Sequence, residues 1–140
     1  MLVAYLLNSF LVAATVLIHH ESLNGLFRLG QKLSVRRNLA VLIGVFGALF
    51  AHVAEIWLFA LGYYYMVRSE DFETLAGNFD GSLIDCVYFS FTTYTSLGFG
   101  DIEPMGYLRF TAGLEALAGL MMITWSASFM FLKMQKYWEV

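Results

Sequence analysis

Charged residues are scarce in this chain, because only 14% of its 140 side chains are Asp, Glu, Lys or Arg and 59% are hydrophobic. A soluble domain of this size has too little interior to bury so much apolar surface. Long stretches with few charges are instead typical of helical membrane proteins. We therefore expect an all-α membrane protein of one domain, with the lipid bilayer as its surroundings.

Cysteine and proline are nearly absent, and there is no excess of positive charge. The single cysteine, Cys86, excludes an internal disulfide framework and a cysteine-rich metal site. The net charge of −3 argues against a nucleic-acid partner. No nucleophile is paired with a base, and no metal-ligand cluster is visible beyond the pair His52 and Glu55. We expect no enzymatic activity.

Three apolar stretches are long enough to cross a bilayer, at residues 2–18, 39–67 and 110–132. The first, within the segment 1–20, lacks the basic start and the small-residue cleavage site of a signal peptide, so we interpret it as a retained helix. The second is longer than a bilayer requires, which indicates a tilted helix or one that projects beyond the membrane.

A fourth apolar segment, residues 82–94, is too short to span. Ser82 or Asp80 can cap its start, and Asp85 in its first turn suits the positive end of a helix dipole. We expect a short helix that enters the membrane and stops part-way, where protein or water must surround the backbone that follows it.

The distribution of charge predicts the orientation. Basic residues occupy the segment 21–38 and the C-terminal tail, whereas acidic residues dominate between residues 70 and 80. Basic loops stay in the cytoplasm. The expected arrangement is an N-terminus outside, a cytoplasmic basic loop at 21–38, an external acidic loop and a cytoplasmic C-terminus. The basic loop is either an amphipathic helix on the membrane surface or a solvated linker.

Residues 92–101 read Thr-Thr-Tyr-Thr-Ser-Leu-Gly-Phe-Gly-Asp and follow the short helix directly. A pore that removes water from a cation must replace it with rings of oxygen, and backbone carbonyls can form such rings if they all point the same way. That requires left- and right-handed backbone in alternation, and glycine adopts the left-handed form at low cost. Gly98 and Gly100 meet this need, and Ser96 adds a hydroxyl at the inner end. The C-terminal end of the preceding helix also favours a cation.

This segment resembles the pore loop of the potassium channel family, whose filter reads Thr-Val-Gly-Tyr-Gly. The resemblance extends to Tyr88-Phe89-Ser90-Phe91 before the segment and to Asp101-Ile102-Glu103-Pro104 after it. It covers about residues 39–133. The chain as a whole is similar to small bacterial channels with a two-helix pore, to which an N-terminal helix has been added.

The resemblance implies a potassium channel pore domain at residues 39–133, with an outer helix at 39–67, a pore helix at 82–94, a filter at 96–100 and an inner helix at 106–132. It assigns potassium binding to Ser96, Leu97, Gly98, Phe99 and Gly100, and filter support to Asp101 and Thr92. One chain carries one pore loop and a filter ring takes four, so we expect three identical subunits as partners in a C4 homotetramer.

The function that this resemblance implies is passive potassium flux across a plasma membrane, the inner membrane of a bacterium, with no cofactor beyond the potassium ions. One departure bears on selectivity, because Phe99 stands where the family has a tyrosine whose phenol braces the filter. Two alternatives stay open: a poorly selective cation channel, and a non-conducting partner or sensor subunit that keeps the pore fold.

The third span carries the candidate gate. Gly119 either lets this helix bend or permits close helix contact. By helical spacing one face holds Met122, Ile123, Ser126 and Met130, and we assign it to the pore lining, with Met130 as a candidate hydrophobic constriction. The alternative for this face is plain packing in the bundle.

Three ionisable side chains, His52, Glu55 and Glu115, interrupt the apolar spans. Such groups are costly in a membrane and turn inward. They form either a hydrogen-bonded strut that supports the pore helix or a proton sensor. We expect Glu115 to face the pore helix, near the hydroxyls of residues 92–94, to be protonated or hydrogen-bonded at neutral pH, and with Glu55 to support the filter. Glu55 would approach from behind and share a proton with it.

Overall fold

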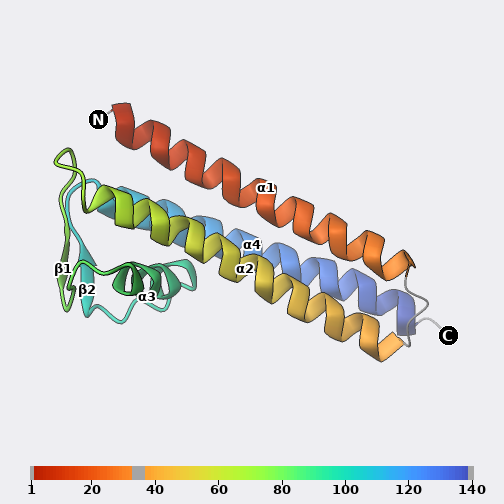
Figure 1. Cartoon of the computed structure of the whole chain (residues 1–140). Helices are drawn as coiled ribbons and strands as arrows, with labels where there is room; N and C mark the ends of the chain where they lie inside the picture. Colours follow the sequence, from red (N-terminus) through yellow and green to blue (C-terminus); the bar gives the residue numbers. More distant parts are fainter. Residues whose placement is uncertain (1, 33–36, 139–140) are drawn as a thin grey trace.

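Three long helices lie side by side in the computed structural model, which describes residues 2–32 and 37–138 (Figure 1). They are α1 (Leu2–Lys32), α2 (Arg37–Met66) and α4 (Leu108–Trp138). Each contains a stretch that is long and apolar enough to cross a membrane. A short helix, α3 (Leu83–Tyr94), lies beside them at one end of the molecule. The prediction of three spans and one short helix is confirmed.

The first helix is longer than expected. α1 continues past residue 20 without a break and ends at Lys32, so residues 21–32 are neither a separate surface helix nor an irregular linker. No proline interrupts this stretch, and Leu23 and Leu26 pack against the rest of the bundle: Leu23 is 4% exposed, and Leu26 lies over Gly47 of α2. Residues 33–36 of the predicted loop lie outside the described residues.

The long helices are apolar on their outer faces as well as at their contacts. The face of α1 toward the other helices repeats every three or four residues and comprises Ala4, Asn8, Leu11, Thr15, His19 and Leu23. Its outer face carries large exposed apolar side chains, among them Leu6, Phe10 and Leu17. A surface of this kind suits lipid, which fits the expectation of a membrane protein.

Small residues in α2 let the neighbouring helices approach closely. A Cβ added at Gly62 would lie 2.8 Å from Leu11, and one at Gly47 would lie 2.2 Å from Leu26. Both leucines belong to α1. Small residues at helix contacts are the usual means of packing within a membrane, where lipid removes the hydrophobic drive for association. α1 is therefore fitted to α2 along most of its length.

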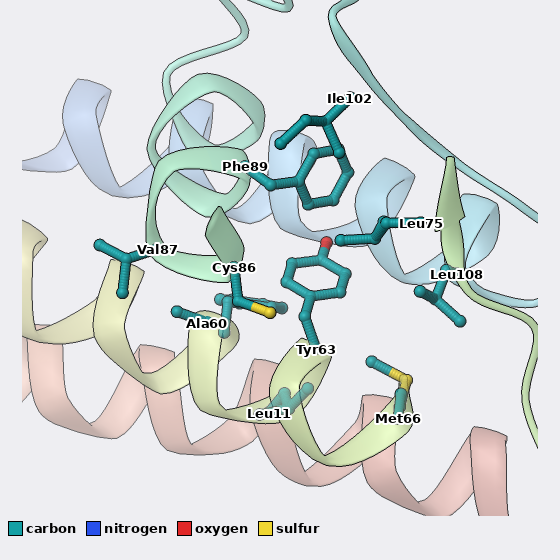
Figure 2. Close-up of a cluster of buried hydrophobic side chains, with 11 residues drawn as sticks. Leu11, Ala60, Tyr63, Met66, Leu75, Cys86, Val87, Phe89, Ile102 and Leu108 are labelled. Carbon is teal, nitrogen blue, oxygen red and sulfur yellow. The ribbon is translucent and has the colours of Figure 1, made fainter. Parts of the chain in front are cut away.

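The main apolar core lies between α2, α3 and the segments that flank the short helix (Figure 2). Tyr63 of α2 stands at its centre, fully buried, and its ring meets the edge of Phe89 of α3 at 4.9 Å between centroids. Leu11 of α1 reaches the same core from the opposite side of α2. The first helix thus helps to hold the short helix in place.

Two short strands, which were not predicted, join the segments before and after α3. β1 (Leu75–Gly77) pairs antiparallel with β2 (Ile102–Pro104), and Gly77 lies opposite Ile102. The amide of Asn78 also donates to the carbonyl of Asp101 at 2.8 Å. This sheet ties the acidic loop to the chain that leaves the candidate filter.

Candidate functional site

The short helix is capped at its start and leads directly into the glycine-containing segment. The hydroxyl of Ser82 accepts a hydrogen bond from the amide of Asp85 at 3.1 Å, and the carboxylate of Asp80 accepts one from the amide of Ser82 at 2.7 Å. The hydrogen bonds that Asp80 accepts from Ser82 lower the pKa of its carboxyl group. At the other end, the amide of Thr95 donates to the carbonyl of Phe91. The last helical residue, Tyr94, is only two positions from Ser96.

The backbone of residues 96–100 alternates in hand. The dihedral φ is +57° at Ser96, +52° at Gly98 and +77° at Gly100, whereas Leu97 and Phe99 have no positive φ. Ser96 is the one non-glycine residue with positive φ in the described part of the chain. Alternation of this kind is what a column of carbonyls on one side requires, as the sequence argument anticipated. The structure adds Ser96 as a third left-handed position.

The segment is anchored to the helix before it. The amide of Gly98 donates to the carbonyl of Thr92 at 3.0 Å, and the amide of Ser96 donates to that of Thr93 at 2.9 Å. Thr92 itself is buried, and its hydroxyl donates to the carbonyl of Phe89. Thr92 therefore holds the middle of the segment through its backbone rather than through its side chain.

The outer end of the segment is held by a contact that the sequence argument missed. The hydroxyl of Tyr88 donates to the carboxylate of Asp101 at 2.9 Å, which raises the pKa of Tyr88. The ring of Tyr88 also stacks on that of Phe99, with 6.4 Å between centroids. Tyr88 lies 13 positions before its acidic partner, and only the fold shows that they meet. A phenol thus does brace this loop, from α3 instead of from position 99.

Glu115 of α4 is fully buried against α3 and α2. Its carboxylate accepts hydrogen bonds from the hydroxyls of Tyr63, at 2.6 Å, and of Ser90. The prediction that Glu115 faces the pore helix and is hydrogen-bonded is confirmed, but its partner on α3 is Ser90 and not one of the predicted residues 92–94. Ser90 lies nearer the start of α3, and its hydroxyl also lies 2.8 Å from the carbonyl oxygen of Ile56, which is an alternative acceptor for its single proton.

Glu55 belongs to a second, separate polar cluster. Its carboxylate lies 2.9 Å from Nδ1 of His19 and 3.4 Å from Nδ1 of His52, and it accepts a hydrogen bond from the hydroxyl of Tyr94. No hydrogen bond joins Glu55 to Glu115 among the described side chains. The predicted sharing of a proton between the two carboxylates was therefore wrong, because each has its own set of donors.

The assignment of the pore-lining face was also wrong in part. Met122 is 3% exposed and packs on Tyr94 and Ile56, and the hydroxyl of Ser126 is buried 3.3 Å from Nε2 of His19. Met130 turns toward Gly44 of α2, where an added Cβ would lie 2.8 Å from its sulfur. The position of α1, which packs on α4 beside these residues, could not be predicted from helical spacing within α4.

Two members of the predicted gate behave differently from the rest. Ile123 is 39% exposed and faces away from the other helices of the chain. Gly119 lies against the end of α3, where an added Cβ would come within 2.1 Å of the carbonyl oxygen of Tyr94. Of the two roles considered for Gly119, the structure shows the close contact.

The filter segment is open on one side. Leu97 and Phe99 are 59% and 64% exposed. A hollow of about 310 Å³ also lies at this segment, and its lining includes Thr93, Ser96 and Gly98 together with Ala112 and Ala116 of α4. The side chains of a single chain therefore leave this part of the site incomplete.

Comparison with known proteins places this arrangement in a family. Residues 38–136 match the family model described as "Ion channel", and the chain belongs to that ion channel family. A curated relative, Protein LctB of Geobacillus stearothermophilus, is 33% identical over 85 residues, which are 61% of this chain and 63% of LctB. The chain thus spans less than two thirds of the length of that relative. No solved structure matches significantly.

The family match covers α2, α3, the candidate filter and nearly all of α4. The chain therefore combines membership of an ion channel family with three helices that are long and apolar enough to span a membrane, and the candidate site lies in the segment between α3 and α4. All of α1 precedes the matched region. The first helix is an addition to the family's pore region in this chain.

Proposed function

We propose that the chain is one subunit of a potassium-selective channel that passes potassium passively down its gradient. The observation that carries the proposal is the backbone of residues 96–100, in which left-handed positions alternate with others directly after the end of α3. Four such segments around an axis would supply stacked rings of carbonyl oxygen, with the Ser96 hydroxyl completing the innermost ring. Potassium would bind at Ser96, Leu97, Gly98 and Phe99.

The same proposal includes a homotetramer. A single chain supplies one filter segment, its Leu97 and Phe99 side chains are uncovered, and a hollow lies between the filter and α4. A neighbouring subunit related by four-fold rotation would fill that hollow and cover these side chains. Closed rotational symmetry of this kind is the common solution for identical subunits.

We further propose that the protein lies in a plasma membrane, a bacterial inner membrane, with its N-terminus outside. α1 and α4 run in the same direction, and α2 runs in the opposite direction (Figure 1). The acidic loop and α3 share one end of the molecule with Leu2, and Arg28 and Lys133 lie toward the other. The rule that basic segments stay in the cytoplasm then orients the whole.

Ion replacement in a bilayer tests the proposal. Purified protein in a planar bilayer between unequal potassium and sodium solutions should give a reversal potential close to the potassium equilibrium potential. A reversal potential near zero would replace potassium selectivity with poorly selective cation conduction. That second function is favoured by one observation: Phe99 has no hydroxyl, and its ring only stacks on Tyr88. A properly assembled protein without any current would contradict both functions.

A further inference from the structure

The buried polar cluster around Glu55 contains side chains from all four helices. A hydrogen-bonded strut that only supports the pore helix would not require so many. His19 comes from α1, His52 and Glu55 come from α2, Tyr94 closes α3, and Ser126 comes from α4. His19 and Glu55 are completely buried, and His52 keeps 15% of its side chain exposed. The two imidazoles lie with 5.2 Å between their centroids.

Three side chains of this cluster bring ligand atoms close together. His19, His52 and Glu55 each offer one possible ligand atom, and these three atoms all lie within 4.8 Å of one another. In a tetrahedral zinc site, bonds of about 2.0 to 2.2 Å place the ligand atoms about 3.3 Å apart. Nδ1 of His19 lies 2.9 Å from one carboxylate oxygen of Glu55, and Nδ1 of His52 lies 3.4 Å from the other, so both imidazoles are near that spacing from the carboxylate. Two imidazoles and one carboxylate are also a ligand set that zinc uses in proteins.

The surroundings of the cluster orient the ligands as a metal site requires. The distal nitrogen of His19, Nε2, lies 3.3 Å from the hydroxyl of Ser126, so this ring can be held with Nδ1 toward Glu55. Hydrogen bonds to the second nitrogen of a ligating histidine are the usual way in which its orientation is fixed. The hydroxyl of Tyr94 lies 3.0 Å from Nδ1 of His52 and donates to Glu55, so a further oxygen is available beside the three ligands.

We propose that His19, His52 and Glu55 form a binding site for a divalent transition-metal ion such as Zn²⁺. The ion would replace the direct contacts of Glu55 with both imidazoles, and its charge would balance a buried carboxylate that is otherwise costly in a membrane. The site joins the added first helix to the pore region.

The position of the site gives it a regulatory role, which rests on the proposed channel function. Tyr94 ends α3 two residues before Ser96, and its hydroxyl bonds to Glu55 and lies against His52. A bound ion would attract Glu55 and His52 and would thereby change their contacts with the hydroxyl of Tyr94. Zn²⁺ would thereby alter conduction from behind the inner end of the filter, without entering the conduction path.

The test measures binding before conduction. Chelator-treated, purified full-length protein in detergent is titrated with Zn²⁺ by calorimetry and with Co²⁺ by visible absorption, whose intensity reports a four-coordinate site. We expect one ion per chain. His19→Ala and His52→Ala should each weaken binding at least tenfold, and His20→Ala should leave it unchanged. The adjacent His20 is a matched control because its ring bonds to Asn24 and lies outside the cluster. Ser126→Ala should weaken binding by about 10- to 100-fold, as expected for a residue that orients a ligand.

Correct assembly of each variant is checked by size-exclusion chromatography, and Glu55→Gln serves where an alanine variant does not assemble, since the amide keeps the shape of the side chain. Absence of stoichiometric binding in the assembled wild type would overturn the metal site, as would equal loss of binding in His20→Ala. Conduction is then recorded with and without Zn²⁺. Binding without any potassium current would contradict the proposed function and leave the metal site standing, whereas current that Zn²⁺ changes equally in wild type and His19→Ala would overturn the regulatory role.

Discussion

A chain uses glycine either to make room for a neighbouring group or to allow a backbone conformation that other residues avoid. Gly98 and Gly113 can be compared on both counts. An added Cβ would have no atom within 4 Å at either position, so neither glycine is there to make room within the subunit. Gly98 has φ of +52°, whereas Gly113 lies in the regular helix α4. Only Gly98 therefore needs to be glycine for its backbone.

This difference gives a matched pair of variants. Gly98→Ala places a Cβ on a left-handed residue at a cost of about 1–2 kcal/mol, which four subunits would bear together. We expect it to abolish selective potassium current, whereas Gly113→Ala should conduct like wild type and gain up to about 1 kcal/mol in helix stability. Bilayer recordings at equal protein amounts measure both. Unchanged selectivity in Gly98→Ala would remove the role assigned to the alternating backbone.

Gly119 is a glycine of the other kind, because it makes room. An alanine Cβ there would overlap the carbonyl oxygen of Tyr94, at 2.1 Å, and approach its ring at 3.0 Å. We expect Gly119→Ala to push α4 away from the end of α3, to lower the thermal stability of the assembled protein and to reduce current. Gly113→Ala is again the control on the same helix. A hinge without steric function predicts the opposite, a stable protein with altered opening only.

Two variants of Glu115 distinguish the role of its shape and hydrogen bonds from the role of its charge. Glu115→Ala leaves the hydroxyl of Tyr63 without its partner, and a buried unsatisfied group costs about 1–3 kcal/mol. Glu115→Gln should be tolerated: its carbonyl can accept from Tyr63 while its amide donates to Ser90, whose hydroxyl can turn to the carbonyl of Ile56.

The thermal midpoint of the detergent-solubilised assembly and the open time of single channels measure the effect of Glu115. We expect a lower midpoint and shorter openings for the alanine variant and values near wild type for the glutamine variant. An alanine variant that behaves like wild type would show that Glu115 does not brace α3. If the glutamine variant instead loses a response to pH that wild type has, Glu115 acts as a proton sensor.

At the scale of elements, the sequence predicted what depends on local pattern. Apolar length indicated the three spans, and the cap at Ser82 together with Asp85 marked the start of α3 within one residue. The end of α1 was not predictable in the same way. Its continuation to Lys32 depends on contacts with α2, such as Leu26 over Gly47, which join residues far apart in the chain.

The candidate site was predictable to a similar degree. The glycine spacing in residues 96–100 indicated the alternating backbone, because that property belongs to successive residues. The partners of the buried groups were not predictable, since Glu115 bonds to Ser90 and Tyr63 across three helices and Glu55 bonds to His19 of the added helix. Helical spacing alone gave the relative positions of Met122 and Ser126 but not the direction in which their face points.

The strand pair suggests a prediction about the outer end of the filter. Gly77 has φ of +90°, and an added Cβ would lie 2.3 Å from the carbonyl oxygen of Asp101, whereas Gly81 has φ of +84° with open space around it. Both alanine variants bear backbone strain, but only Gly77→Ala displaces Asp101 and thereby its bond to Tyr88. We expect Gly77→Ala to reduce potassium selectivity and Gly81→Ala to conduct nearly normally. Equal effects in reversal-potential measurements would show that the strands do not position the filter.

At the scale of the whole molecule, the distribution of charge and the directions of the helices predict the same orientation in the membrane. The three long helices alternate in direction, so Leu2, the acidic loop and α3 share one end (Figure 1). The proposed orientation places this end outside the cell and Arg28 in the cytoplasm. The native Cys86 interferes little with a thiol assay, since it is buried in α3 and burial raises the pKa of its thiol to about 11. At pH 7.5 it is protonated and unreactive.

Single cysteines at two exposed positions then test the orientation. Thr74→Cys lies in the acidic loop and Arg28→Cys lies near the end of α1, and both native side chains are exposed. A membrane-impermeant maleimide applied to intact cells should label Thr74→Cys strongly and Arg28→Cys no more than wild type, because only the acidic loop faces outward. After the cells are opened, both variants should label to the same extent, which verifies that each cysteine is reactive. Labelling of Arg28→Cys alone in intact cells would invert the proposed orientation, and with it the side of the membrane toward which residues 96–100 lie.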